Sequence, residues 1–160
     1  MKRPLASLAI LIGAVASGPV CAQEAVEVRI GAVLASNSGQ GFDPRLVALR
    51  RQFHTLFPYT SYNLVKEERR LVAPGVKVGF DIPGGRYLLV TSSGMKDERV
   101  SLHVMLIEGS RPVVDTALTL RKHATFLVGG PKHQEGVLII AIGADPLPMS
   151  EPAPEPVSHQ

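Results

Sequence analysis

The chain has 160 residues, 17 Lys and Arg against 14 Asp and Glu, and a formal net charge of +3. Lys2 and Arg3 lie in a segment that we expect to be removed; without them 15 basic and 14 acidic side chains remain, for a net charge of +1. The longest charged cluster, residues 66–70, mixes both signs, and the chain has no Trp and only three Tyr. Composition therefore argues against a nucleic-acid surface, and the length suits one domain.

Residues 1–22 have the pattern of a cleavable export signal. Two basic residues precede an apolar run over residues 5–16, and small residues follow up to Ala22. We expect cleavage before Gln23, a periplasmic or extracellular protein, and no membrane span in the mature chain. An uncleaved anchor would need about 20 apolar residues. A lipidated Cys21 is disfavoured by Val20, which stands where lipoprotein signals carry a small residue. Cys21 is the only cysteine, so no disulfide is expected after cleavage.

The first predicted elements are a strand and a helix. Residues 26–35 begin with strict alternation and end as an apolar run, which predicts a strand entering the core. Asp43 followed by Pro44 is a typical helix start. Apolar residues then recur at helical spacing up to Phe57, and Pro58 ends the helix.

The rest of the domain is predicted to consist of short strands joined by glycine-rich turns. The strand candidates are residues 59–64, 76–82, 86–92, 100–108, 112–120, 124–129 and 136–142. Tight turns favour antiparallel hairpins. The predicted fold is α+β: one amphipathic helix packed on a mainly antiparallel, curved or partly closed sheet of about seven strands, forming a single domain over residues 23–144. Residues 137–142 are apolar on both faces, which predicts a strand covered by the helix on one side and a folded-over sheet on the other.

Residues 145–160 carry proline at nearly every second position up to residue 156. Such a segment cannot supply regular backbone donors, and it predicts an extended, disordered tail. The tail is either solvated without a partner, or a polyproline ligand or spacer.

No residues form a recognisable catalytic or cofactor motif, so we expect no catalytic site and no cofactor. The best candidates for metal ligands are His123 and His133, which flank neighbouring predicted strands, with Asp115 or Glu135 as an oxygen donor. A zinc site needs three or four convergent ligands, and the spacing of these residues does not indicate one. We therefore predict no metal site and interpret both histidines as surface or turn residues.

Two glycine-rich segments are candidates for exposed binding loops. One contains Asn37, Gly39 and Gly41. The other, over residues 129–136, contains Gly129, Gly130, Pro131, Lys132 and His133 between two apolar strands. A rigid loop on a stiff hairpin is a common way of presenting contacts. The alternative for residues 129–136 is that the glycines only satisfy a tight hairpin with a bulge. The alternative for the first segment is a plain connection between a strand and a helix.

Three parts of the chain resemble a group of small exported bacterial proteins of uncharacterised function: residues 33–46, residues 57–62, and residues 127–142 with their Gly-Gly-Pro and Gly-Val-Leu-Ile segments. The resemblance covers most of the predicted domain and implies no activity or catalytic residue. The leading hypothesis is an exported non-enzymatic module that binds a partner in the cell envelope or contributes to an envelope assembly. The alternative is a periplasmic metal-binding protein or metal-dependent enzyme using the His123 and His133 region.

Overall fold

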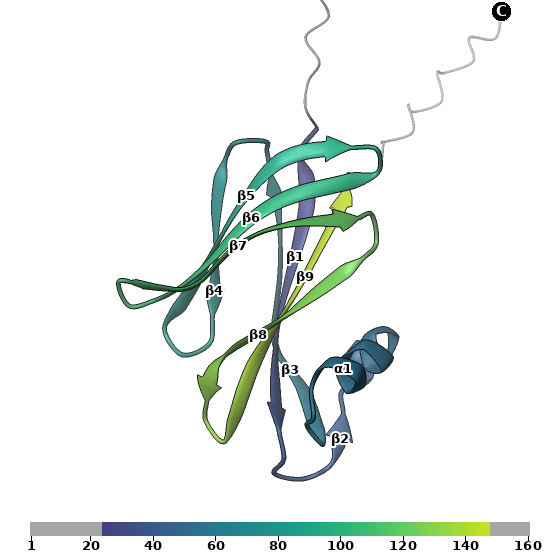
Figure 1. The fold of residues 1–160 in the computed structure, drawn as a ribbon, viewed down its shortest axis with the longest axis vertical. Coiled ribbons are helices and arrows are strands. Elements are labelled where there is room, and N and C mark those ends of the chain that lie inside the picture. The colour runs from purple at the N-terminus through teal and green to yellow at the C-terminus, as the bar shows by residue number, and fades with distance from the viewer. Residues whose placement is uncertain (1–23, 148–160) are drawn as a thin grey trace, which may run out of the picture.

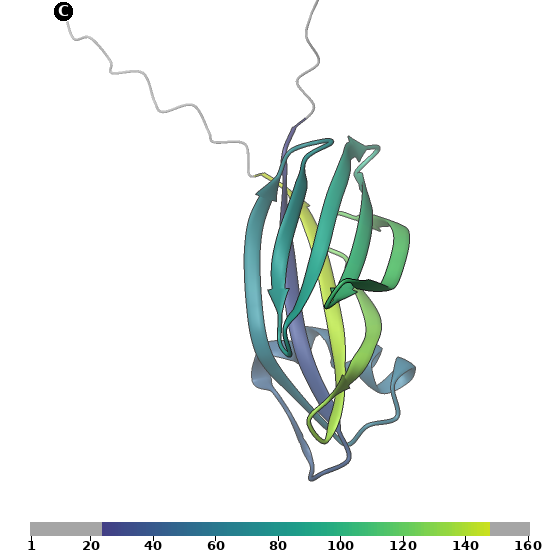
Figure 2. The ribbon, with the colours of Figure 1, turned by 90° about the vertical axis from the view of Figure 1, so that its left-hand side faces the viewer.

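The computed structural model describes residues 24–147, which form two β-sheets and one short helical segment (Figures 1 and 2). The five-stranded sheet has the order β2 (Gly41–Phe42), β3 (Ser61–Val72), β1 (Val26–Ser36), β9 (Gly136–Pro146) and β8 (Thr125–His133). The four-stranded sheet has the order β4 (Lys77–Ile82), β5 (Arg86–Lys96), β6 (Arg99–Glu108) and β7 (Arg111–Arg121). Neighbouring strands are antiparallel, except that β2 pairs with β3 in parallel.

The prediction of a mainly antiparallel β-rich domain with one helical segment is confirmed. The finer prediction of a single sheet of about seven strands needs correction, because the described residues form nine strands in two open sheets. The mixed-charge residues 66–70, which showed no apolar alternation, extend β3 to Val72. The chain then crosses from β3 in one sheet to β4 in the other, and turn chemistry alone does not indicate which sheet a hairpin joins.

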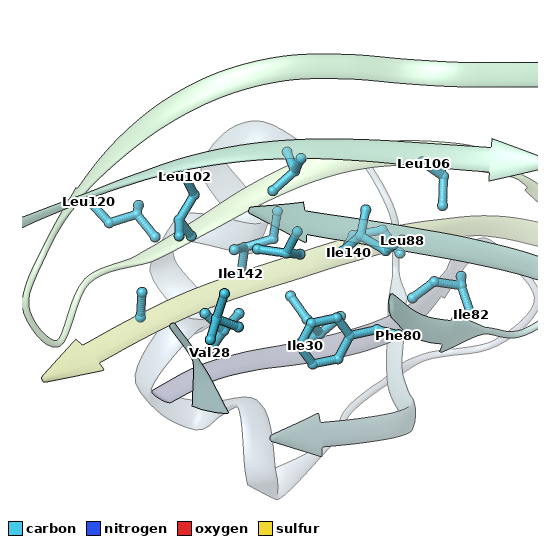
Figure 3. Close-up of a cluster of buried hydrophobic side chains, with 14 of the residues drawn as sticks. Val28, Ile30, Phe80, Ile82, Leu88, Leu102, Leu106, Leu120, Ile140 and Ile142 are labelled. Carbon is cyan, nitrogen blue, oxygen red and sulfur yellow. The ribbon is translucent and has the colours of Figure 1, made fainter. Parts of the chain in front are cut away.

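The main core lies between the two sheets (Figure 3). Val28 and Ile30 of β1 and Ile140 and Ile142 of β9 face it from the five-stranded sheet. The four-stranded sheet contributes side chains that include Phe80, Ile82, Leu88, Leu102, Leu106 and Leu120. Alternate residues of β1 and β9 point inward, as the pleat of a strand requires.

A second apolar cluster lies on the outer face of the five-stranded sheet. Val33 of β1 and Ile139 of β9 pack there against Phe53 of the helix, whose side chain is fully buried. Since the neighbouring residues of β9 face the main core, this strand is covered on both sides, as predicted. The helix lies over only the lower part of the sheet in Figure 1, so it does not cover the upper part of the outer face.

The helical segment begins where the sequence predicts but not with the predicted geometry. Its first part is a 3-10 helix, η1 (Pro44–Leu49), and only the second part, α1 (Arg50–Leu56), is α-helical. The Asp43 carboxylate accepts the Arg45 backbone N–H at 2.9 Å and so caps the first turn. Asp43 also accepts the Leu64 backbone N–H at 3.1 Å, which ties the helix start to the edge of β3.

The strands β8 and β9 are longer than predicted. Most of the predicted loop over residues 129–136 belongs to β8, which continues to His133 past a register shift between Gly129 and Lys132. Strand β9 runs to Pro146, which pairs with Val26, beyond the predicted domain boundary at residue 144. The predicted signal and most of the predicted tail lie outside the described residues. Within residues 24–147, no helix has the length and apolar character needed to cross a membrane.

Candidate functional site

The two predicted binding segments meet at one end of the five-stranded sheet. Ala35, near the end of β1, pairs with Val137, near the start of β9, so the loop after β1 and the β8–β9 turn lie at the lower end in Figure 1. Thr60 fixes the loop, because its Oγ1 donates to the Gly39 carbonyl at 2.6 Å and its N–H donates to Asn37 Oδ1 at 3.2 Å. Gly41 pairs with Ser61 as part of β2.

The glycines of β8 have a packing role. A Cβ on Gly130 would lie 2.7 Å from the carbonyl oxygen of Leu138, and one on Gly129 would lie 3.5 Å from the Phe57 ring. Pro131, Lys132 and His133 belong to the same strand. The glycines are thus explained by a close approach of strands at a bulge, which was the alternative to a binding loop.

The structure does not bring the candidate metal ligands together. His123 precedes β8 and His133 ends it, so the two histidines lie at opposite ends of one strand. The His123 ring Nδ1 lies 2.9 Å from Asp145 Oδ1. Asp115, on β7, lies 2.6 Å from the His103 ring, and Glu135 lies in the β8–β9 turn. Across residues 24–147, no three His, Cys, Asp or Glu side chains are placed to hold a metal ion.

A pocket that the sequence did not predict lies on the outer face of the five-stranded sheet, beside the 3-10 helix. It has a volume of about 390 Å³. We call it the arginine pocket. Its lining residues come from β1, η1, β3, β8, β9 and the β7–β8 turn, and they are Arg29, Gly31, Arg45, Leu46, Ala48, Leu49, Leu64, Glu67, Arg69, His123, Thr125 and Ala141.

Small residues make the sheet surface hollow at this place. Gly31 of β1 pairs with Ala141 of β9, so the floor between these strands carries no side chain larger than a methyl group. The next residue of β9 on this face is Gly143, which pairs with Arg29. A Cβ on Gly143 would lie 3.1 Å from the Arg29 Nη2 atom, so the glycine leaves room for the Arg29 guanidinium to lie beside β9.

The basic side chains of the pocket differ in their partners. Arg45 donates to the Asp43 carboxylate at 2.7 Å and to the Leu64 carbonyl at 2.8 Å. The hydrogen bonds that Asp43 accepts from the Arg45 side chain, and from the backbone N–H groups of Arg45 and Leu64, hold the pKa of Asp43 well below its usual range. Arg69 donates to Glu67 Oε1 at 3.1 Å. Both guanidinium groups are therefore neutralised by carboxylates of this chain.

Arg29 has no such partner. It is half-buried on β1 directly opposite Arg69 of β3, and like charges at directly opposed positions of a sheet repel. Among residues 24–147, no carboxylate lies within 4.0 Å of its guanidinium and its side chain donates no hydrogen bond. Among the described residues, the pocket therefore contains one arginine, Arg29, whose guanidinium has no carboxylate or hydrogen-bond partner and is available to an anion.

No protein-family model, curated protein or solved structure matches the chain. The geometry must therefore identify the site. The sequence did contain a signal, since Arg29 alternates with apolar residues and so had to face outward from β1. Its significance depends on the pairing of β1 with β3 and β9, which the sequence does not provide.

Proposed function

We propose that this protein is an exported, non-enzymatic module of the cell envelope, which holds a partner by an anionic group in the arginine pocket. The observation that carries the proposal is the half-buried Arg29 side chain, whose guanidinium has neither a carboxylate partner nor a hydrogen bond among the described residues. Desolvating a charge without pairing it is unfavourable, and an incoming anion would supply the missing partner. Export rests on the predicted signal over residues 1–22.

The chemistry of the pocket favours binding over catalysis. Guanidinium groups stay protonated near neutral pH, so they orient and neutralise anions but do not act as bases or nucleophiles. The two other titratable side chains that line the pocket have partners of their own. Glu67 pairs with Arg69, and the ring of His123 lies beside Asp145.

The alternative metal-binding function has no geometric support from the pair of histidines on which it depended. His123 and His133 are separated by the whole length of β8, whereas zinc ligands converge on one ion at about 2 Å.

Affinity capture from envelope extracts tests the proposal. The bait is the mature chain from Gln23 to Gln160, compared with its Arg29→Gln variant and with Arg121→Gln, a control that removes an exposed arginine of β7 outside the pocket. We expect one component to be retained by the wild type and by Arg121→Gln and lost with Arg29→Gln. We also expect about 0.5 M salt to weaken retention, because salt screens an exposed ion pair. Equal capture by all three baits would refute the role of the pocket.

A further inference from the structure

We propose that the arginine pocket selects a single carboxylate group attached to a compact apolar group. This inference rests on the proposed function, because it specifies the chemistry of the ligand in the same pocket. It is carried by three features of the site: the number of free cations, the position of the nearest acidic groups, and the apolar wall that η1 and β3 provide.

The charged side chains of the site favour a ligand that carries a single negative charge. Arg29 is the pocket arginine that has no ion pair within the described residues, whereas Arg45 and Arg69 are already paired. Glu67 lines the same pocket, and Glu27 lies 4.0 Å from Arg69, another lining residue. A second negative charge on the ligand would therefore approach carboxylates without meeting another free cation. A planar guanidinium also matches a carboxylate in a two-bond geometry, which adds selectivity for this group.

The apolar part of the pocket lining suits an apolar group. Leu46, Leu49 and Leu64 line it from η1 and β3, and Ala48 and Ala141 add methyl groups. The volume of about 390 Å³ is near the lower end of the range for small-molecule sites. An aromatic ring or a short branched chain fits this space, with its carboxylate on Arg29 and its apolar part on the leucines.

Two sources would present this chemistry: a free organic acid, and the C-terminal carboxylate of a peptide whose last residue is apolar. Both place one carboxylate next to one apolar side group. The shared chemistry is the proposal, and the experiment separates the sources.

The test is a titration of the ¹⁵N-labelled mature chain, followed by backbone amide shifts in NMR spectra. The probes are benzoate, benzamide, acetate, inorganic phosphate, and the peptide N-acetyl-Gly-Gly-Leu as free acid and as C-terminal amide. We expect benzoate to shift the amides around Arg29 and Gly143 saturably. Benzamide and acetate should bind at least about tenfold more weakly, because each lacks one of the two contacts. Phosphate should also bind more weakly than benzoate.

Two variants show where the probe binds. Arg29→Gln should abolish saturable binding of benzoate while the melting temperature stays close to that of the wild type, since Arg29 donates no hydrogen bond within residues 24–147. Leu49→Ser, on the apolar wall, should weaken the binding of benzoate but not the binding of acetate. Arg121→Gln is the control and should leave the affinities for benzoate and acetate unchanged.

A peptide acid that binds at least about tenfold more tightly than benzoate would identify chain termini as the source of the ligand. The reverse order of affinities would identify free acids.

Other outcomes overturn the inference. If phosphate or acetate binds as tightly as benzoate at Arg29, the ligand class is wrong, but the anion-binding function stands. If the peptide amide or benzamide binds like the acid, the carboxylate is not recognised. If no carboxylate binds saturably, the inference fails, and loss of envelope capture with Arg29→Gln would still support the proposed function on its own.

Discussion

A buried arginine connects the two sheets, and two neighbouring glycines allow its contribution to stability to be measured. Arg86 of β5 is 8% exposed. It donates to Glu108 at 2.8 Å, to the Pro83 carbonyl at 3.0 Å and, across the sheets, to the Lys132 carbonyl of β8 at 3.1 Å. Gly84 and Gly85 both have positive φ, at 88° and 70°. A Cβ on Gly84 would lie 2.2 Å from Arg86 Nη1, whereas a Cβ on Gly85 would have no atom within 4 Å.

Substitution by alanine should therefore affect the two positions differently. Both variants adopt a left-handed conformation that costs an L-residue about 1–2 kcal/mol. Gly84→Ala must in addition displace the Arg86 guanidinium from the Pro83 and Lys132 carbonyls. Hydrogen bonds of charged groups contribute about 1.5–3 kcal/mol each, and water replaces part of this at a partly exposed site. We expect Gly84→Ala to lower the free energy of unfolding by about 2–3 kcal/mol more than Gly85→Ala, measured by urea denaturation.

The control is the same pair of substitutions in an Arg86→Met background. Without the guanidinium, the difference between the two alanine variants should fall below about 1 kcal/mol, because the remaining neighbour of a Gly84 Cβ, the His133 Nδ1 atom at 3.1 Å, needs to move only slightly. Equal effects of the two variants in the wild-type background would show that the guanidinium moves at no cost. A difference that persists in the Arg86→Met background would show that the cost of a Gly84 Cβ does not come from the guanidinium. Either result refutes the role assigned to Arg86.

Three further predictions concern the core, the pocket and the helix start. Ile140→Ala, in the fully buried part of β9, should lower the free energy of unfolding by about 2–5 kcal/mol in urea denaturation; a smaller loss would mean that the sheets close over the cavity. Gly143→Ala places a Cβ 3.1 Å from Arg29 Nη2. It should weaken benzoate binding severalfold in the NMR titration and change the free energy of unfolding by less than about 1 kcal/mol. Unchanged binding would mean that Arg29 reaches the ligand from a different position. The hydrogen bonds from Arg45 hold the pKa of Asp43 below its ordinary value of 3.8. The ionised carboxylate therefore stabilises the fold at pH values above 3.8, and this contribution to the free energy of unfolding is lost as the pH falls below 3.8. Asp43→Asn should lower the melting temperature at pH 7, and its melting temperature should fall less than that of the wild type between pH 4 and pH 2; parallel decreases would refute the assignment.

The features that depend on local chemistry could be predicted from the sequence. Asp43 followed by Pro44 correctly located the start of the helix, because a capping carboxylate and a fixed φ act over a few residues. The apolar run of β9 correctly indicated a strand covered on both faces. The pattern could not show that the first helical turn is 3-10, since apolar residues at these spacings suit both helix types.

The features that depend on strand pairing could not be predicted. The glycines of β8 left an exposed loop and a hairpin with a bulge open as alternatives, and only the pairing with β9 decides between them, because Gly130 allows the backbone of β9 to approach closely. The pairs Arg29 with Arg69 and Gly31 with Ala141 create the pocket, and they join segments separated by about forty and more than one hundred residues. A sequence shows which side chains alternate along a strand, but not which strand lies beside it.

The position of the arginine pocket follows from the short length of the helix. The 3-10 and α-helical turns together span Pro44–Leu56, which covers the apolar residues of one part of the outer face and leaves the charged residues of β1 and β3 uncovered. At the border between these two parts, leucines of η1 and arginines of the sheet line the same pocket. Asp43 fixes this border, because its carboxylate holds the helix start, the edge of β3 and the Arg45 side chain at once. A change at Asp43 should therefore disturb both the stability of the helix and the shape of the pocket, whereas a change at Arg29 should affect the pocket alone.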